Sequence, residues 1–285
     1  MRTPPPSVPR ACIAEAAGTY LLVLFSIVPV AVATLTPSGL HLWQVASITG
    51  FGVALAIYVT AAASGAHLNP AVSLAFAVRR PGDFPPRRLP AYWGAQLAGA
   101  VLAGATLYLF YGALIRRFEA ANGITRGESE SALSAMVFGQ YFPNPGMFGA
   151  GAGATFSVSP WAAAGVEAFG TAILALVIFA LVDARNTGLT AKSLAPFLIG
   201  FTVAVLIGLF APLTQAGWNP ARDFGPRLIT LFAGWGAVAI PGPSNGFWVY
   251  TVGPMLGAPI GALLYDVLIR PALPERSSGA DGDAL

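Results

Sequence analysis

Six long apolar stretches dominate the sequence and restrict the chain to a membrane fold. Each supplies the ~20 residues that an α-helix needs to cross a hydrocarbon core of ~30 Å. Only 9% of the residues are charged, against roughly 25% in soluble proteins. We therefore expect an all-α membrane protein with a single domain. The predicted spans are residues 11–33, 43–63, 90–112, 161–182, 194–213 and 247–269.

Two shorter apolar segments, residues 69–78 and 219–232, begin with the same tripeptide, Asn-Pro-Ala. An asparagine before a proline is a helix-start signal, because Asn caps the first turn and Pro takes a position whose N–H is not needed. At 1.5 Å per residue these segments reach only ~15–20 Å, about half a bilayer. We therefore expect two re-entrant half-helices. Their motifs are Asn69, Pro70, Ala71 and Asn219, Pro220, Ala221.

The chain contains an internal repeat around two glutamates. The sequence A-E-A-A-G-T around Glu15 corresponds to V-E-A-F-G-T around Glu167, and the asparagines follow 54 and 52 positions later. Each half, about 11–112 and 161–270, holds three spans and one half-helix. Because three is odd, the two halves must have opposite orientations in the membrane, and the half-helices approach from opposite faces.

Basic residues favour one side of this topology. With both termini in the cytoplasm, ten of the fifteen Lys and Arg residues lie on inner segments, three in an outer loop at 113–160 and two in the second half-helix. Since cytoplasmic loops are enriched in positive charge, we expect a multi-pass protein of the cell membrane with both termini inside. The outer loop is expected to be irregular and to fold over the outer mouth. The ends of the chain, 1–10 and 271–285, are expected to be disordered tails.

Few residues are available for metal or redox chemistry. The chain has one cysteine, Cys12, and two histidines, His41 and His67, which lack the spacing of a metal site. No H-E-x-x-H motif or supported Ser–His pair indicates a membrane enzyme. We expect no catalytic residue, no metal and no cofactor. The glycines at 94, 99 and 104 and at 253, 257 and 261 indicate close helix packing rather than a nucleotide loop.

The half-helices predict the chemistry of a pore. If both begin near the bilayer midplane, their N-terminal ends, each worth about +0.5 charge, face one another and repel cations and hydronium. The side-chain oxygens of Asn69 and Asn219 accept from backbone N–H groups of their own helices, which leaves the NH₂ groups for the permeating molecule. Non-helical residues before each asparagine present carbonyl oxygens, opposite an apolar wall. These positions are Gly65, Ala66, His67, Leu68, Ala216, Gly217 and Trp218.

These residues together resemble the aquaporin and glycerol-facilitator family, the major intrinsic proteins. The resemblance rests on the paired Asn-Pro-Ala segments, the two glutamate spans and the sequence Y-W-G-A-Q from Tyr92, and it covers about residues 11–270. Asp223, Arg227 and the sequence Y-F-P-N-P from Tyr141 are similar to the glycerol-facilitator branch. The resemblance implies the aquaporin-like fold, with six transmembrane helices and two half-helices in inverted repeats, and a homotetramer with one pore per subunit.

The resemblance also implies an outer selectivity filter that is closed by Arg222. An ionisable residue at membrane depth is costly and is therefore a functional candidate; a snorkelling anchor is the alternative. By distance from the motifs, the other filter positions are Thr49, Ile207 and Ala216. Glycerol facilitators have large aromatic side chains at the positions matched to Thr49 and Ala216. We therefore expect a wider and less aromatic filter, similar to that of plant and bacterial channels for boric or arsenous acid.

Four other charged residues are expected to support the structure. Glu15 and Glu167 should accept hydrogen bonds from the backbone of the irregular loops, the alternative being proton relays. Asp223 lies in the first turn of a half-helix, where a carboxylate offsets the helix dipole, and it should pair with Arg227. For His67 we expect a neutral ring that fixes its loop, with a pH gate as the alternative.

The sequence therefore predicts a passive channel for water and small uncharged solutes, above all polyols of the glycerol type. Its expected partners are these solutes, membrane lipid and further copies of the chain, and not nucleic acid. The alternative within the family is a channel for metalloid hydroxides such as boric or arsenous acid. The alternative from another class is a proton-coupled transporter, which would accumulate solute uphill under a pH gradient.

Overall fold

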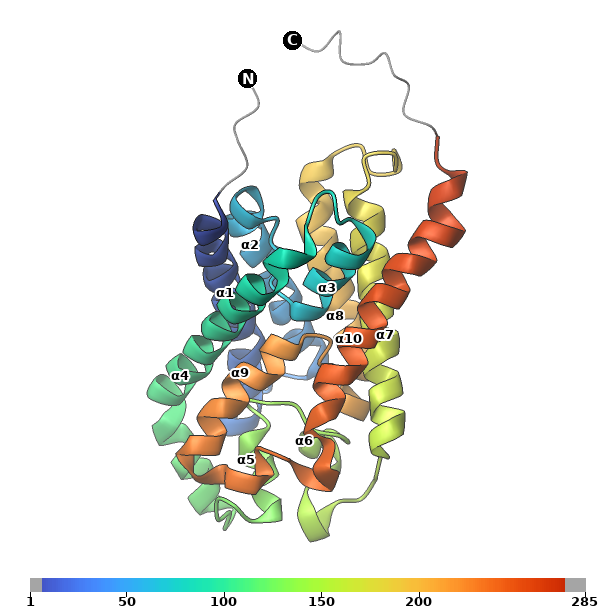
Figure 1. Cartoon of the computed structure of the whole chain (residues 1–285). Helices are drawn as coiled ribbons and strands as arrows, with labels where there is room; N and C mark the ends of the chain where they lie inside the picture. The colour runs from blue at the N-terminus through green and yellow to red at the C-terminus, as the bar shows by residue number, and fades with distance from the viewer. Residues whose placement is uncertain (1–6, 275–285) are drawn as a thin grey trace.

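The computed structural model describes residues 7–274, and within these residues every regular element is helical. Among the described residues, six helices are long and apolar enough to cross a membrane, and they form one bundle (Figure 1). This confirms the predicted all-α membrane fold. The first half of the chain supplies α1 (Val8–Leu35), α2 (Leu42–Ser64) and α4 (Leu89–Ala121), and the second half supplies α7 (Pro160–Val182), α8 (Ala195–Thr214) and α10 (Val249–Leu264).

Both predicted tails overlap helical residues. α1 begins at Val8, so the tail predicted for residues 1–10 is wrong for its last three positions. Pro9 lies in the first turn, where its missing N–H leaves no hydrogen bond unmade, and so it does not delay the helix. At the other end, a π-helical turn at Tyr265–Ile269 and a 3₁₀ turn at Arg270–Ala272 continue α10. Residues 1–6 and 275–285 of the predicted tails lie outside the described residues.

Two short helices begin inside the bundle, as expected for half-helices. α3 (Pro70–Arg79) and α9 (Pro220–Thr230) start close together at mid-height and run toward opposite ends of the molecule (Figure 1). A π-helical turn at Leu231–Trp235 extends α9, and Gly234 in it has φ +105°, which ends the helix. The halves of the chain therefore enclose a central region from which both half-helices depart.

The segment between α4 and α7 differs from its predicted bounds. α4 ends at Ala121 rather than at residue 112, because hydropathy measures the length within lipid whereas the exposed residues Arg116 and Arg117 continue the helix into water. The remaining segment is irregular apart from short turns, and it buries Val137 and Phe138 at the end of the bundle. The turns are Ser129–Ser131, α5 (Ala132–Ala135), α6 (Pro145–Phe148) and Gly151–Gly153.

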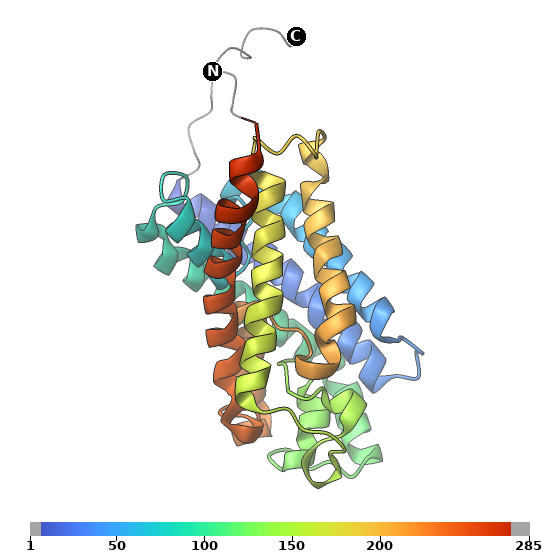
Figure 2. The ribbon, with the colours of Figure 1, turned by 90° about the vertical axis from the view of Figure 1, so that its right-hand side faces the viewer.

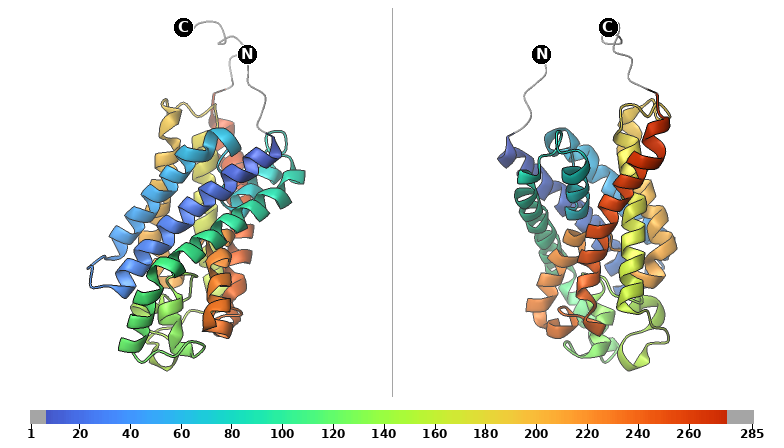
Figure 3. Two further views of the ribbon diagram at one scale, coloured as in Figure 1. Left: turned by 90° about the vertical axis from the view of Figure 1, so that its left-hand side faces the viewer. Right: turned by 45° about the vertical axis from the view of Figure 1, so that its right-hand side comes forward.

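Small residues allow two pairs of long helices to pack closely. α1 lies along α4, and α7 lies along α10, as the side views show (Figures 2 and 3). A Cβ atom at Gly99 of α4 would collide with the carbonyl oxygen of Ala16, and one at Gly257 of α10 with that of Ala168. The predicted packing role therefore holds at these glycines. It is wrong for Gly94, which faces open space.

Ion pairs hold the end of the bundle at which α1 begins and α10 ends (Figure 1). Asp266, in the turn after α10, accepts hydrogen bonds of 2.6–2.9 Å from Arg79 and Arg80 at the end of α3. Asp183, just after α7, accepts from Arg270 at 3.0 Å. These contacts connect α3 and α7 to the extension of α10. The segment with α5 and α6 lies at the opposite end.

Candidate functional site

A cavity of about 760 Å³ passes through the bundle. Its lining includes Leu40 and His41, which precede α2 at one end, and Val182 and Lys192, which lie between α7 and α8 at the other end. Asn69 and Asn219 line its middle. The cavity therefore connects the two ends of the molecule past both asparagines.

The two walls of this cavity have different chemistry. Aliphatic side chains form one part of its lining, and the polar backbone of the loops that precede α3 and α9 forms another. A molecule in the cavity meets most hydrogen-bonding groups on the loop side, and the hydroxyl residues Ser26 of α1 and Thr49 of α2 lie among the aliphatic ones. The aliphatic wall comprises Leu22 of α1, Val53 and Ile57 of α2, Leu174 and Ile178 of α7, and Ile199, Val203 and Ile207 of α8.

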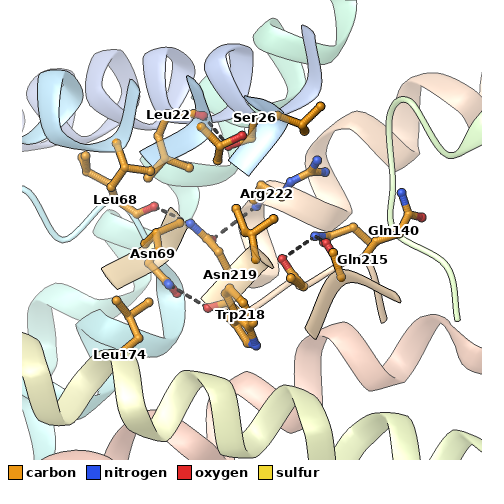
Figure 4. Close-up of a pocket in the computed structure, with 18 of the residues that line it drawn as sticks. Leu22, Ser26, Leu68, Asn69, Gln140, Leu174, Gln215, Trp218, Asn219 and Arg222 are labelled. Carbon is orange, nitrogen blue, oxygen red and sulfur yellow. Dashed lines mark hydrogen bonds between the residues drawn. The ribbon is translucent and has the colours of Figure 1, made fainter. Parts of the chain in front are cut away.

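Asn69 and Asn219 each donate a hydrogen bond to the loop of the other half of the chain. Nδ2 of Asn69 donates to the carbonyl oxygen of Trp218, and Nδ2 of Asn219 donates to that of Leu68, both at 2.8 Å (Figure 4). The prediction that both NH₂ groups serve the permeating molecule therefore needs correction. One hydrogen of each group ties the two loops together, because the last carbonyl of each loop points at the opposite asparagine, and one hydrogen of each remains.

Each asparagine also caps its own half-helix, as expected. Oδ1 of Asn69 accepts from the N–H of Ala71 at 2.9 Å, and Oδ1 of Asn219 accepts from Ala221 and Arg222 at 3.1 and 3.3 Å. The prolines that follow occupy the first helical position. The positive ends of both half-helices therefore face the middle of the cavity, with about +0.5 charge each. Pro70, Ala71, Pro220 and Ala221 are buried behind the asparagines.

The loops before the asparagines adopt the same unusual backbone. In each loop, three residues have left-handed φ values between +49° and +87°. For residues other than glycine this conformation costs about 1–2 kcal/mol each, so the fold must hold it in place. Left-handed residues turn successive carbonyl groups in a direction that a helix or strand would not allow. The matched positions are Gly65 and Gln215, Ala66 and Ala216, and Leu68 and Trp218.

All seven predicted carbonyl positions line the cavity, but their oxygens are not equally free. Leu68 and Trp218 each accept from an asparagine. The Ala216 carbonyl accepts from Nε2 of Gln140 at 2.9 Å. A carbonyl oxygen has two lone pairs, so each of these three retains one acceptor site.

Glu15 and Glu167 hold the two loops from behind, outside the lining of the cavity. Glu15 accepts from the N–H groups of His67 and Leu68 at 2.9 and 2.7 Å, and Glu167 accepts from those of Gly217 and Trp218 at the same distances. Both glutamates are fully buried. The sequence predicted these backbone hydrogen bonds for both glutamates, and they turn the N–H groups of the loops away from the cavity.

His67 is enclosed by three aromatic rings. Its ring lies 4.7 Å from that of Phe76, 4.5 Å from that of Phe84 and 5.4 Å from that of Tyr92, measured between centroids. Its Nδ1 is 3.2 Å from the hydroxyl of Ser73. These contacts agree with a ring that fixes the first loop, although part of the residue also lines the cavity.

The four predicted filter residues, Thr49, Ile207, Ala216 and Arg222, all line the cavity. Arg222 is only 7% exposed, and its Nη1 donates to the carbonyl oxygen of Phe138 at 2.8 Å. The guanidinium is therefore fixed by the segment between α4 and α7. The snorkelling alternative does not fit a side chain that is held this way inside the bundle.

Sequence reasoning missed three residues of this region. Phe138 holds Arg222 through its carbonyl, and the side chains of Gln140 and Gln215 line the cavity beside it. The available signal was the sequence Y-F-P-N-P, which begins directly after Gln140. This sequence indicated that the segment is important. It could not indicate the contact with the Phe138 carbonyl, because every residue type has a backbone carbonyl.

Asp223 and Arg227 form the predicted pair, and they hold the same segment in place. The Asp223 carboxylate accepts from the N–H of Gln140 at 2.7 Å, and Nη2 of Arg227 donates to the Gln140 carbonyl oxygen. Nη1 of Arg227 also donates to the carbonyl oxygen of Ala239 at 2.9 Å. Neither side chain reaches the cavity lining. The pair therefore supports the loop that fixes Arg222.

The chain matches the family model of the major intrinsic proteins over residues 4–265. The chain belongs to the major intrinsic protein family. It is therefore a membrane channel of that family and not an enzyme. Within residues 7–274, no group of three or more His, Cys, Asp or Glu side chains is placed to hold a metal ion.

Several members of the family are similar to this chain over nearly their whole length. The glycerol uptake facilitator protein of Pseudomonas aeruginosa is 43% identical over 98% of this chain and 96% of the relative. The propanediol uptake facilitator PduF of Citrobacter freundii is 41% identical over 94% and 95%. The X-ray structure of the aquaglyceroporin from Plasmodium falciparum is similar to the structure of this chain, with a TM-score of 0.77 and 28% sequence identity. The match covers 93% of this chain and 98% of the aquaglyceroporin chain.

Proposed function

We propose that the chain is a passive channel for water and small uncharged polyols of the glycerol type. The observation that carries this proposal is the cavity that passes the reciprocal pair Asn69 and Asn219 with a polar wall facing an aliphatic one. Hydroxyl groups can exchange hydrogen bonds along the polar wall while the carbon backbone of a polyol contacts the other. The names of the relatives, which refer to glycerol and propanediol uptake, support the same substrate class.

Charge selection follows from the same geometry. The positive ends of α3 and α9 meet at the middle of the cavity, and Arg222 adds a full positive charge on the way to it. Cations and hydronium are therefore repelled at two places, at Arg222 and at the N-terminal ends of the two half-helices. A water at the middle receives one hydrogen from each asparagine, so its own hydrogens point outward and a proton-conducting chain is interrupted.

A second candidate substrate class is the metalloid hydroxides, boric and arsenous acid. The specific observation in favour is that Thr49, Ile207 and Ala216, which line the cavity with Arg222, are small or aliphatic. A filter without aromatic side chains gives room to a compact trihydroxy acid as well as to a linear polyol.

The hydrogen bonding of both glutamates argues against a proton-coupled transporter. Glu15 has four donors: two backbone N–H groups, the Ser64 hydroxyl and the Gln96 amide. Glu167 holds two backbone N–H groups of the second loop. Protonation of either carboxylate during a cycle would weaken the loop that it supports. Neither residue lines the cavity, so neither is placed to exchange protons with a passing solute.

We further propose that both termini face the cytoplasm and that the protein acts as a homotetramer in the cell membrane. The end of the bundle at which α1 begins carries Arg10, Arg79, Arg80, Arg87, Arg88, Arg185, Lys192 and Arg270, which supports a cytoplasmic position for it. The exposed apolar side chains on the outer faces of the helices suit contact with lipid and neighbouring subunits.

Reconstitution into liposomes tests the proposal. We expect stopped-flow light scattering to report faster entry of glycerol and water than into empty vesicles, with no uptake against a gradient when a pH difference is imposed. A panel that adds urea, boric acid and arsenous acid separates the two substrate classes. Rates equal to those of empty vesicles for every solute would refute the channel, and uphill accumulation would favour the transporter.

A further inference from the structure

Gln215 occupies a position at which the first half of the chain has a glycine. Gly65 ends α2 with φ +87°, and its N–H donates to the carbonyl oxygen of Ala61 at 2.9 Å. Gln215 ends α8 with φ +55°, and its N–H donates to that of Ala211 at the same distance. A left-handed residue at a helix end is usually glycine, because a Cβ atom is unfavourable there. We therefore expect the side chain of Gln215 to make contacts that offset its unfavourable backbone conformation.

The Gln215 side chain binds the outer segment at two points. Its Oε1 accepts from the N–H of Tyr141 at 2.8 Å, and its Nε2 lies 3.4 Å from the carbonyl oxygen of Met136. These two residues bound the stretch whose middle residue, Phe138, accepts the hydrogen bond from Arg222. The side chain thus spans the base of the loop that holds the filter arginine.

The Gln215 backbone takes part in the same connection. Its carbonyl oxygen accepts from Nε2 of Gln140 at 3.2 Å, and the neighbouring Ala216 carbonyl accepts from the same nitrogen at 2.9 Å. Gln140 is only 2% exposed, so the surrounding protein restricts the movement of its side chain. Figure 4 shows both glutamines on the side of the cavity that also carries Arg222. Residues 136–141 are therefore fastened to the end of α8 by two amide side chains that point in opposite directions.

We infer that Gln215 is a positioning residue that determines which solutes pass the filter. By fastening residues 136–141 to α8, it fixes the Phe138 carbonyl and, through it, the guanidinium of Arg222. This matters in the present chain because Thr49 and Ala216 are too small to confine a solute from the other sides, so the position of Arg222 sets the opening. The inference rests on the proposed function, since it concerns the selection of polyols by size.

Two substitutions distinguish the effect of the Gln215 side-chain hydrogen bonds from the effects of its backbone conformation and of its side-chain volume. Gln215→Gly removes the side chain and suits the left-handed backbone, so folding is retained. Gln215→Met keeps the length of the side chain but lacks the amide. The matched control is Gln44→Met, at an exposed glutamine outside the cavity lining whose Oε1 accepts from the N–H of His41 at 2.6 Å, so that it also loses one amide bond to the backbone but away from Arg222. The measured quantity is the ratio of erythritol to glycerol permeability in proteoliposomes.

We expect both Gln215 variants to raise this ratio by about fivefold, the order of effect of one lost hydrogen bond to a backbone group, while Gln44→Met leaves it at the wild-type value. An unchanged ratio in both variants would overturn the inference, and so would a proportional fall in both permeabilities, which a purely structural role predicts. A change in Gln215→Gly alone would assign the effect to volume and also overturn it. Absence of glycerol flux through the wild-type protein would instead contradict the proposed function.

Discussion

The carboxylate of Asp223 and the guanidinium of Arg227 lie one turn apart in α9 and share hydrogen bonds of 2.8 and 2.9 Å, with each side chain only 1% exposed. Arg227 also lies 4.7 Å from the centre of the Tyr141 ring. Because the pair binds both the N–H and the carbonyl of Gln140, it connects the half-helix to the segment that fixes Arg222.

Removal of one partner of this pair should destabilise the protein strongly. Asp223→Ala leaves the Arg227 charge buried and unpaired, a situation that typically costs about 3–5 kcal/mol. Denaturation of the detergent-solubilised protein, followed by tryptophan fluorescence, measures the loss. The double substitution Asp223→Leu with Arg227→Met removes both charges and should recover part of it.

The matched control for this prediction is Asp83→Ala, at an exposed aspartate in the loop after α3. Surface substitutions of this kind usually change stability by less than about 0.5 kcal/mol. If Asp223→Ala were as mild as the control, the pair would not be a structural support.

Asn69 and Asn219 should behave as a coupled pair in stability measurements. Asn69→Ala removes a helix cap, worth about 1 kcal/mol, and one hydrogen bond to the Trp218 carbonyl oxygen, worth about 0.5–1.5 kcal/mol. Asn219→Ala should cost a similar amount through Leu68. Each substitution loosens the loop that the other asparagine binds. We therefore expect the double variant to lose less stability than the sum of the losses in the two single variants. Strictly additive losses would show that the two cross-loop bonds are independent.

A bulkier filter should restrict large solutes more than water. Thr49→Trp combined with Ala216→Phe places two aromatic rings beside Arg222, and we expect erythritol permeability to fall about tenfold, equivalent to about 1.4 kcal/mol in the barrier, with water reduced far less. Proteoliposome swelling assays measure both rates. Leu109→Trp on the exposed outer face of α4 is a control of similar added volume. Equal losses for water and erythritol would mean that these two positions do not form the filter.

Stability in acid should depend on Asp183 at the end of α7. Burial raises the pKa of Asp183, but hydrogen bonds from the Arg185 N–H, the Tyr265 hydroxyl and the Arg270 guanidinium outweigh it and hold the pKa below the usual value for aspartate. Because the folded-state pKa is depressed, the contribution to stability is fully present above pH ~4, the unfolded value. It is lost as the pH falls through the lower folded-state pKa.

Asp183→Asn tests this dependence on pH. The variant should be less stable than the wild type at pH 7, and the difference should shrink as the pH falls below ~4, the unfolded value, because the wild type then loses the contribution of its ionised carboxylate. Thermal unfolding in detergent at a series of pH values measures the difference. A difference that stays constant between pH 7 and pH 3 would contradict the assignment.

The fold and the middle of the pore could be predicted from sequence because their signals are local. Hydropathy located six spans, and Asn-Pro located the start of α3 and α9 to within one residue, since capping and proline geometry act over a single turn. The end of α4 at Ala121 could not be predicted this way. Hydropathy does not detect the part of a helix that extends beyond the lipid.

The hydrogen bonds that hold Arg222 and the two loops in place could not be predicted from sequence, because they involve backbone atoms of residues far apart in the chain. The bond from Arg222 to the Phe138 carbonyl joins residues 84 positions apart. The two bonds between Asn69, Asn219 and the opposite loops span 149 and 151 positions. Any residue type can offer a carbonyl, so the identity of Phe138 or Leu68 gave no indication of these contacts. Gln215 was detectable only by comparison with Gly65, its counterpart in the repeat.

The inverted repeat has a consequence for the direction of travel. A solute that enters from either end meets loop carbonyls, then one asparagine, then the other, then loop carbonyls again, because the two loops have matching backbones. The central passage therefore has no built-in sense of import or export, and we expect equal rates both ways for equal gradients. Net flow is then decided by whichever side of the membrane consumes the solute.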